Sequence, residues 1–263
     1  MLRPGTLPGG ITATIARVPD DRAPEVLLVH GMFGGAWQFA GWQELLAGRG
    51  RSSIAIDLRG HHGSRPVADI GKVTLRDYLD DALAAASTLG RPVVIGHSMG
   101  GLIAQKLAEA GAVSAAVLIC SAPPRGISVA STRLLARQLK HAPAILLSRP
   151  IVPGRADADA LFLNRIPLDQ RDALLERMEP ESGRAARELS LGMLAVDASR
   201  VHCPVLTVGA SDDRFLPPRI ARAIAKKYRS EYREYADHAH YIVGEPGWER
   251  VAEDVTGWIA LHA

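Results

Sequence analysis

The sequence predicts an α/β protein: a doubly wound, mostly parallel sheet with one helical cap insertion. Short runs rich in Val, Ile and Leu alternate with amphipathic segments along most of the 263 residues. This alternation is typical of parallel strands joined by crossover helices. It stops once, over residues 127–200, where helical patterns follow one another without a convincing strand between them.

Seven apolar runs are predicted to form the sheet. Most of them are continuously hydrophobic, which is typical of parallel strands buried on both faces. The runs at 52–58, 92–97 and 115–120 follow at the spacing of crossover connections. The runs are residues 11–18, 25–30, 52–58, 92–97, 115–120, 204–210 and 230–236.

Three core helices have recognisable ends. Thr74 is a good N-cap for a helix that closes at Gly90, and its apolar residues fall on one face. A second helix spans about 98–110 and ends before a glycine. A third spans about 247–261 and carries an apolar stripe with two tryptophans. Each presents one apolar face, as helices that pack on a sheet do.

The insertion at 127–200 divides the core domain into two parts, 1–126 and 201–263. A cap over the carboxyl ends of the strands would enclose an apolar pocket and exclude water. Its predicted helices, punctuated by prolines, are 128–140, 157–165, 168–178 and 183–196. Its candidate pocket residues are Leu134, Leu135, Leu139, Ile145, Leu146, Leu161, Phe162, Leu174, Leu175, Met178, Leu191 and Met193.

Composition argues against several classes of partner. The net charge is +3 and no block of like charge occurs, so we expect no nucleic-acid binding. No run approaches the roughly 18 apolar residues of a membrane span, and the first ten residues lack the apolar core of a secretory signal. We therefore expect a cytoplasmic monomer or homodimer that binds a small-molecule substrate and no membrane.

No cofactor and no metal are predicted. His61 and His62 are adjacent, and His202 precedes Cys203, but a metal site needs three or four ligands at a workable spacing. The glycine-rich segment 31–35 lacks the Lys-Ser/Thr of a phosphate-binding loop and the register of a dinucleotide fingerprint.

The segment G-H-S-M-G at 96–100 joins a predicted strand to a predicted helix. A serine hydroxyl is a weak nucleophile that needs a base and access to substrate. A sharp turn with small residues on both sides gives this access, and the helix N-terminus adds unpaired N–H groups beside the reacting centre. This context matches the G-x-S-x-G nucleophile elbow, so Ser98 is the candidate nucleophile.

With these residues the chain resembles the α/β-hydrolase superfamily over nearly its whole length. V-H-G-M-F-G-G-A-W at 29–37 is similar to the family's His-Gly oxyanion loop. D-L-R-G-H-H-G-S at 57–64 is similar to its Asp-x-x-Gly-His-Gly-x-Ser turn, with His62 where the pattern usually has glycine. The resemblance implies a triad in the chain order Ser, acid, His.

The resemblance leaves two neighbouring candidates for the acid. Counting back from Pro217 in the family's Asp-Arg-x-x-Pro pattern selects Asp213. Counting forward from Gly209 selects Asp212. We favour Asp213, and the other aspartate is then a cap or turn residue.

Two histidines also compete for the role of base. His240 has the family's spacing to Glu245 and Pro246, whereas His238 does not. We favour His240, with His238 as the alternative.

The implied reaction is hydrolysis of a carboxylic ester or lactone of a small apolar substrate through an acyl-enzyme. His240 would accept the Ser98 proton, and Asp213 would orient the imidazole. The backbone N–H groups of Met99 and, by resemblance, Met32 would stabilise the oxyanion. Two other functions stay open: a small-molecule receptor with slow or single-turnover hydrolysis, and a lyase or cyclase that uses His240 as base.

Overall fold

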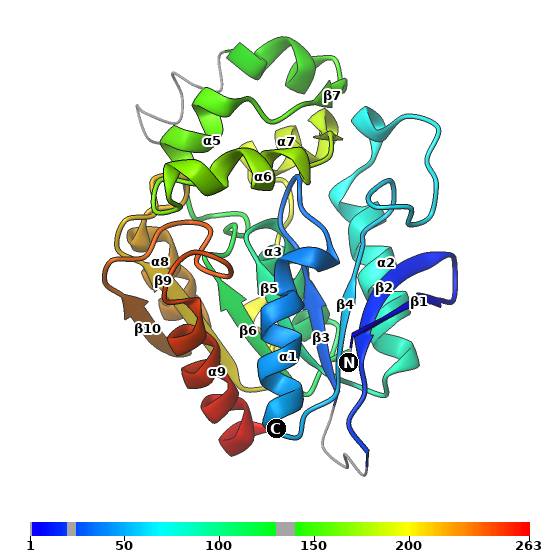
Figure 1. Ribbon diagram of the computed structural model, residues 1–263, viewed down its shortest axis with the longest axis vertical. Helices are drawn as coiled ribbons and strands as arrows, with labels where there is room; N and C mark the ends of the chain where they lie inside the picture. The colour runs from blue at the N-terminus through cyan, green and yellow to red at the C-terminus, as the bar shows by residue number, and fades with distance from the viewer. Residues whose placement is uncertain (1, 20–24, 130–139) are drawn as a thin grey trace.

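The computed structural model describes residues 2–19, 25–129 and 140–263. Its centre is an eight-stranded sheet of order β1-β2-β4-β3-β5-β6-β9-β10 (Figure 1). Neighbouring strands from β4 to β10 pair in parallel, and the pairs β1–β2 and β2–β4 at one edge are antiparallel. The predicted mostly parallel α/β sheet is therefore confirmed. The strands are β1 Arg3–Leu7, β2 Ile11–Ala16, β3 Val26–Val29, β4 Ser53–Ile56, β5 Val93–His97, β6 Ala115–Ile119, β9 Val205–Ala210 and β10 Glu231–Tyr235.

Helices cover both faces of this sheet (Figure 1). Alternate residues of β3 divide between two hydrophobic clusters, because successive side chains of a strand point to opposite faces. Val26 and Leu28 pack with the cluster that includes α1 and α9, whereas Leu27 and Val29 pack with the one that includes α2, α3 and α8. These helices are α1 Ala40–Gly48, α2 Leu75–Thr88, α3 Met99–Glu109, α8 Pro218–Tyr228 and α9 Trp248–His262.

The predicted core elements are all observed, with ends that differ from the prediction by at most two residues. Thr74 caps α2 as expected: its hydroxyl accepts a hydrogen bond from the Asp77 N–H at 3.0 Å, and the Asp77 carboxylate accepts one from the Thr74 N–H at 2.9 Å. This reciprocal capping box satisfies two backbone donors that the helix itself leaves unpaired.

An N-terminal hairpin, β1 with β2, was not predicted. Pro4 and Gly5 disfavour a strand in the sequence, but β1 lies at the sheet edge, where proline is tolerated. The turn between the strands contains Gly9 and Gly10, both with positive φ, a conformation that suits glycine.

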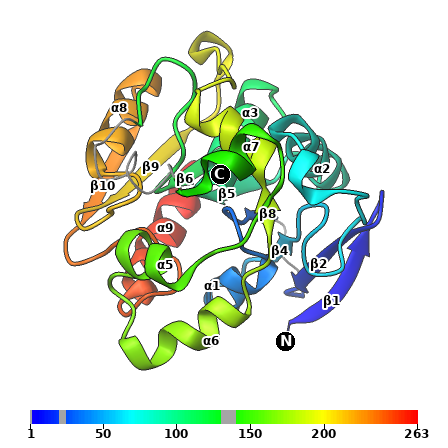
Figure 2. The ribbon, with the colours of Figure 1, turned by 90° about the horizontal axis from the view of Figure 1, so that it is seen from above.

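The insertion lies over the carboxyl ends of the strands, as seen from the side in Figure 1 and from above in Figure 2. The expectation that it contains no strand is wrong, since β7 and β8 form a short antiparallel pair. Its described helices are otherwise joined by turns and loops. The elements are β7 Pro150–Ile151, α5 Arg155–Leu161, η3 Leu168–Gln170, α6 Arg171–Glu176, β8 Glu181–Ser182 and α7 Gly183–Ser190.

The predicted helices of the insertion differ from the observed ones mainly at their ends. The 183–196 helix stops at Ser190 because Gly192 adopts a left-handed φ of 57°, which terminates a helix. The 168–178 helix begins with a 3-10 turn, η3, before α6. Most of the predicted 128–140 helix lies outside the described residues, and helical structure is described from 140 to 146.

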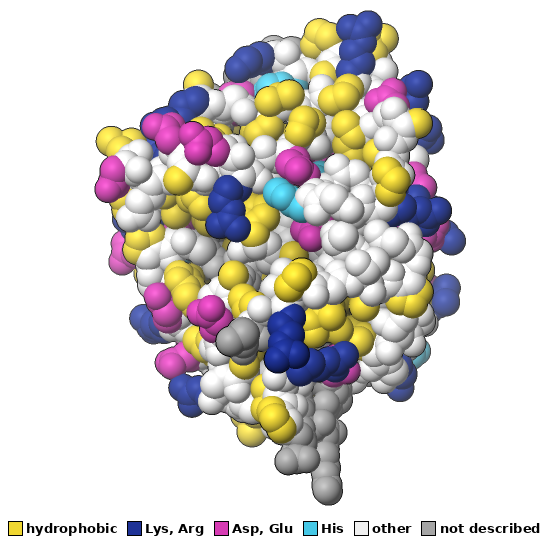
Figure 3. Space-filling view, turned by 45° about the vertical axis from the view of Figure 1, so that its right-hand side comes forward, with side chains coloured by type: hydrophobic (Ala, Val, Ile, Leu, Met, Phe, Trp, Pro, Cys, Tyr) yellow, Lys and Arg dark blue, Asp and Glu magenta, His cyan; other side chains and the backbone are white. Residues whose placement is uncertain are grey.

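Acidic, basic and hydrophobic side chains are interspersed over the face shown in Figure 3. Five large apolar side chains in the described part of the insertion are each more than half exposed: Leu146, Leu147, Val152, Leu168 and Leu191. Within the described ranges, no helix has the length and hydropathy to cross a bilayer.

Candidate active site

Ser98 occupies a sharp turn between β5 and α3, with φ 54° and ψ −117°. A serine rarely adopts this conformation unless its surroundings impose it. Here the Ser98 N–H donates to the Ile119 carbonyl at 3.0 Å, and the Ser98 carbonyl accepts from the Ala122 N–H at 2.9 Å. The motif glycines are required because a Cβ on Gly96 would collide with the backbone of Gly100.

Ser98, His240 and Asp213 form one continuous hydrogen-bonded chain. The Ser98 Oγ lies 3.0 Å from His240 Nε2, and His240 Nδ1 lies 2.8 Å from Asp213 Oδ2. All three side chains are buried, and they follow β5, β10 and β9 respectively. In this geometry the imidazole can take up the hydroxyl proton while the carboxylate holds the imidazole in place.

The two adjacent aspartates have different surroundings. Asp213 is buried, and its second oxygen accepts hydrogen bonds from the N–H groups of Phe215 at 2.9 Å and Leu216 at 2.7 Å. Asp212 points away to an ion pair with Arg165 at 2.8 Å, with 43% of its side chain exposed. The structure therefore brings Asp213, not Asp212, to the imidazole.

The loop after β10 is held so that His240 faces the serine. His238 does not reach Ser98; its Nδ1 lies 2.9 Å from Glu245 Oε1, which also accepts the Ala239 N–H at 2.6 Å. On the other side, His97 Nε2 lies 2.8 Å from the His240 carbonyl oxygen. Burial lowers the pKa of His97 to about 3, so the neutral ring donates its Nε2–H to this carbonyl.

The buried histidines behind the site predict a loss of stability in acid. Burial lowers the pKa of His97, and likewise of His30, from 6.5 to about 3. The unfolded chain binds these protons near pH 6.5, whereas the folded chain does so near pH 3. Their contribution to stability is therefore complete above pH 6.5 and is lost as the pH falls towards 3.

We expect His97→Gln to reduce the slope of the unfolding free energy against pH. The reduction is about 1.4 kcal/mol per pH unit between about pH 4 and 6, since one proton uptake on unfolding is removed. Denaturant titrations of both proteins at several pH values measure it. Identical slopes for wild type and His97→Gln would contradict the lowered pKa of His97.

The loop after β3 passes directly over Ser98. A Cβ on Gly31 would lie 2.9 Å from the Ser98 Cβ, so a side chain there would crowd the serine. His30 fixes this loop, because its Nδ1 donates to the Gly31 carbonyl at 2.7 Å and its Nε2 accepts a backbone N–H at 3.1 Å. Met32 and Met99, the two predicted oxyanion donors, line the same cavity as Ser98.

Cys120 lies beside the acid at the end of β6. Cys120, Asp213 and His240 each offer an atom of a metal-ligating type within 4.8 Å of one another. Asp213 and His240 already bind each other, and burial followed by the nearby Asp213 charge raises the pKa of the Cys120 thiol well above its usual value. Metals bind the thiolate, so this cluster favours hydrogen bonding over metal binding.

Comparison with known proteins identifies the family. A family model described as the alpha/beta hydrolase family matches residues 26–254. This chain belongs to the alpha/beta hydrolase family. It is similar to a monoacylglycerol lipase of Mycolicibacterium smegmatis, with 30% identity over 259 residues, 90% of this chain and 88% of the relative.

Solved structures agree on the fold of this alpha/beta hydrolase. A monoacylglycerol lipase from Paleococcus ferrophilus aligns with a TM-score of 0.74 at 22% identity, covering 96% of this chain and 99% of that one. A thermophilic esterase from Thermogutta terrifontis aligns with a TM-score of 0.71 at 22% identity, covering 100% of both chains. The predicted family, fold and hydrolase class are confirmed.

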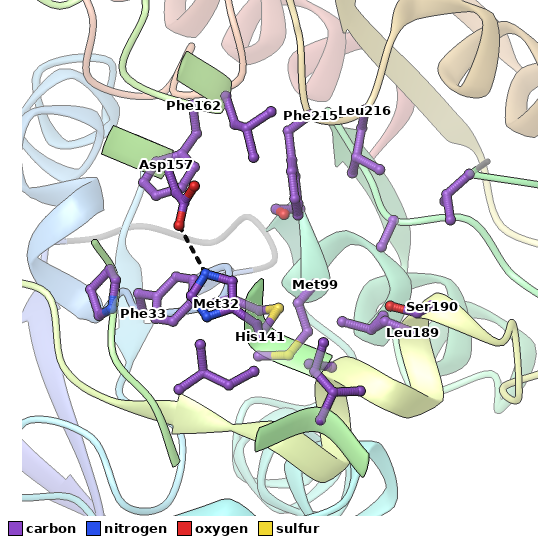
Figure 4. A pocket seen from close by; sticks show the side chains of 18 of the residues that line it. Met32, Phe33, Met99, His141, Asp157, Phe162, Leu189, Ser190, Phe215 and Leu216 are labelled. Atoms are coloured by element: carbon purple, nitrogen blue, oxygen red, sulfur yellow. Dashed lines mark hydrogen bonds and ion pairs between the residues drawn. The ribbon is translucent and has the colours of Figure 1, made fainter. Parts of the chain in front are cut away.

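Ser98 lines an apolar cavity of this hydrolase. Figure 4 shows several of the other side chains that line it. Met32, Met99 and Phe215 come from the core, whereas Phe162 and Leu189 come from the insertion. A second, smaller cavity on the same serine is lined by Phe33, Gln38, Met178 and Tyr241 among others.

The pocket residues expected in the insertion fall into four groups. Ile145, Leu161 and Phe162 line the larger cavity, and Phe162 and Met178 line the smaller one. Leu174 and Leu175 pack against a hydrophobic cluster instead. Leu146, Leu191 and Met193 are exposed, contrary to the expectation. Leu134, Leu135 and Leu139 lie outside the described residues.

Sequence patterns missed one polar pair in the larger cavity. His141 Nε2 lies 2.8 Å from Asp157 Oδ2, and Figure 4 shows the pair among apolar side chains. Neither residue belongs to a motif, and they are brought together by helical segments that the sequence placed only approximately. The sequence did not predict this pair because it does not indicate that the two residues lie close together in the folded insertion.

His62 shows how the chain accommodates its departure from the family's usual glycine. It adopts a left-handed φ of 45°, a conformation that glycine adopts without strain. Its N–H donates to the Glu179 carboxylate at 2.5 Å, and its Nε2 accepts the Trp37 indole N–H at 3.1 Å. The contact with Glu179 holds the turn against the insertion, and the contact with Trp37 holds it against the core.

Proposed function

We propose that this hydrolase cleaves carboxylic esters, or lactones, of apolar acids through an acyl-enzyme on Ser98. The observation that carries the proposal is the hydrogen-bonded chain from Ser98 through His240 to Asp213, which ends at an apolar cavity. Ester hydrolysis needs a nucleophile, a base and a place for the acyl group, and this arrangement supplies all three.

In the first half of the reaction, the Ser98 Oγ attacks the ester carbonyl carbon and His240 Nε2 takes the hydroxyl proton. The carbonyl oxygen becomes an oxyanion, which the Met32 and Met99 N–H groups would bind. When the intermediate collapses, the carbon–oxygen bond to the alcohol breaks and His240 returns the proton to the alcohol. Asp213 keeps the imidazole in the required tautomer and stabilises its cation.

In the second half, a water molecule takes the place of the alcohol. His240 removes one proton from this water, and the resulting hydroxide attacks the acyl carbon of the ester on Ser98. Collapse of the second intermediate breaks the bond to Ser98, which regains its proton from His240. The products are one acid and one alcohol.

The lining of the larger cavity defines the substrate we propose. Its walls are mostly side chains of Met, Phe, Leu, Ile and Val, with Asp157 as an acidic exception that is paired to His141. An aliphatic acyl chain gains free energy by leaving water for such a site, whereas an unpaired charge would be strongly disfavoured. The similarity to a protein named monoacylglycerol lipase also supports an apolar acyl group.

A p-nitrophenyl ester series of increasing acyl length tests this function, with Ser98→Ala as the control. We expect many turnovers per protein, a preference for uncharged acyl chains, and loss of turnover in the variant. A burst that stops at one acyl group per protein would favour a receptor with single-turnover hydrolysis. Unchanged activity in Ser98→Ala would overturn the proposal.

A further inference from the structure

Glu181 is a buried carboxylate where the insertion meets the core, and its side chain is 0% exposed. Its Oε1 accepts hydrogen bonds from the Tyr78 hydroxyl at 2.5 Å and the Ser182 N–H at 2.6 Å. Its Oε2 accepts the Phe33 N–H at 3.3 Å and lies 3.5 Å from His61 Nε2. Apolar residues often replace a buried ion pair without loss of stability. Stability alone therefore does not explain why a charged residue is buried at position 181.

The surroundings of Glu181 keep it ionised. Burial alone would raise its pKa, but the facing His61 and the hydrogen bonds it accepts hold that pKa below its usual value. Burial alone would lower the pKa of His61, but Glu181 raises it to about 8. At neutral pH the pair is therefore a carboxylate facing an imidazolium.

The backbone that Glu181 binds is the loop over Ser98. Phe33 directly follows Met32 and has a left-handed φ of 64°, a conformation that is unfavourable for a bulky residue unless its surroundings impose it. Its N–H donates to Glu181, and its carbonyl accepts the Glu179 N–H at 3.2 Å. Both backbone groups of Phe33 are thus held by residues 179–181 of the insertion.

We propose that Glu181 is a positioning residue for the oxyanion loop: by binding the Phe33 N–H, its carboxylate fixes the adjacent Met32 N–H in line with the reacting carbonyl. The inference rests on the proposed ester hydrolysis at Ser98. In this proposal the insertion has a second role besides lining the pocket, because Glu181 in β8 holds one of the two oxyanion donors in place. His61 and Tyr78 support this role by fixing the carboxylate.

The test compares matched oxoester and thionoester substrates, each with a p-nitrophenol leaving group. Sulfur accepts hydrogen bonds weakly, so the thionoester depends less on the oxyanion donors. We expect Glu181→Gln to lower kcat for the oxoester about 10- to 100-fold, with KM changed by less than about threefold. The kcat for the thionoester should fall much less in this variant, so the ratio of the oxoester rate to the thionoester rate falls.

Glu179→Gln is the matched control. It removes a carboxylate two residues away, but the backbone N–H that binds Phe33 remains. We expect the rate ratio of this variant to equal that of wild type. Equal losses on both substrates in Glu181→Gln would overturn the inference, because a general defect in folding or pocket shape affects both esters alike.

Tyr78→Phe provides a second variant if Glu181→Gln folds poorly. It withdraws one donor from the same carboxylate, and the rate ratio should fall only about threefold, because the Phe33 N–H keeps its acceptor in this variant. An unchanged ratio would count against the inference. If wild type itself shows no Ser98-dependent turnover, the proposed function fails; if it turns over and only the ratios are unchanged, the role of Glu181 alone fails.

Discussion

Replacing Asp213 by asparagine is expected to lower kcat about 10⁴-fold while the protein stays folded. The asparagine carbonyl can still accept the Phe215 and Leu216 N–H groups that Asp213 binds. The amide NH₂ would then face His240 Nδ1, which lies 2.8 Å from the present carboxylate. The imidazole would keep its proton on Nε2 and could not accept the one from Ser98. Steady-state kinetics on a p-nitrophenyl ester measure the loss.

Asp212→Asn is the matched control for this prediction. Asp212 pairs with Arg165 at the surface and does not contact the imidazole. Loss of such a pair has a small effect, so we expect kcat within about twofold of wild type. A large loss in Asp212→Asn together with a small one in Asp213→Asn would reverse the assignment of the acid.

The second large effect concerns the base. His240→Gln is expected to lower kcat by about 10⁶-fold, because glutamine cannot take up the Ser98 proton. KM should change little, since the imidazole acts on the reacting proton and not on the acyl chain. The pre-steady-state burst of p-nitrophenol should also disappear, because acylation itself needs the base.

His238→Gln is the corresponding control, since glutamine can still donate to the Glu245 carboxylate that His238 contacts. We expect kcat within about tenfold of wild type. Retention of the burst in His240→Gln, or its loss in His238→Gln, would contradict the assignment of the base.

The sequence predicted the parts of the site that local rules govern. Gly96 and Gly100 mark the elbow because the turn leaves no room for a Cβ. Resemblance to the family's patterns, through the spacing of Asp213 to Pro217 and of His240 to Glu245, selected the two residues that the structure joins to Ser98. Each of these signals spans only a few residues of the chain.

The sequence did not predict features that depend on contacts distant in the chain. β7 and β8 pair over two residues each, which is too short for a hydrophobic pattern. Glu181 and Phe33 are separated by 148 positions, and nothing near either residue indicates that they meet. The edge strand β1 is a local exception, since it pairs with the next strand along the chain. It was not predicted because its mostly exposed residues show no alternating hydrophobic pattern.

The most direct test of the central claim is to capture the acyl group. Wild-type protein mixed with a p-nitrophenyl ester is quenched in acid during the burst, digested and analysed by mass spectrometry. The account predicts one acyl group per protein on the peptide that contains Ser98, and none in Ser98→Ala. An acyl group on another residue, or full turnover by Ser98→Ala, would contradict it.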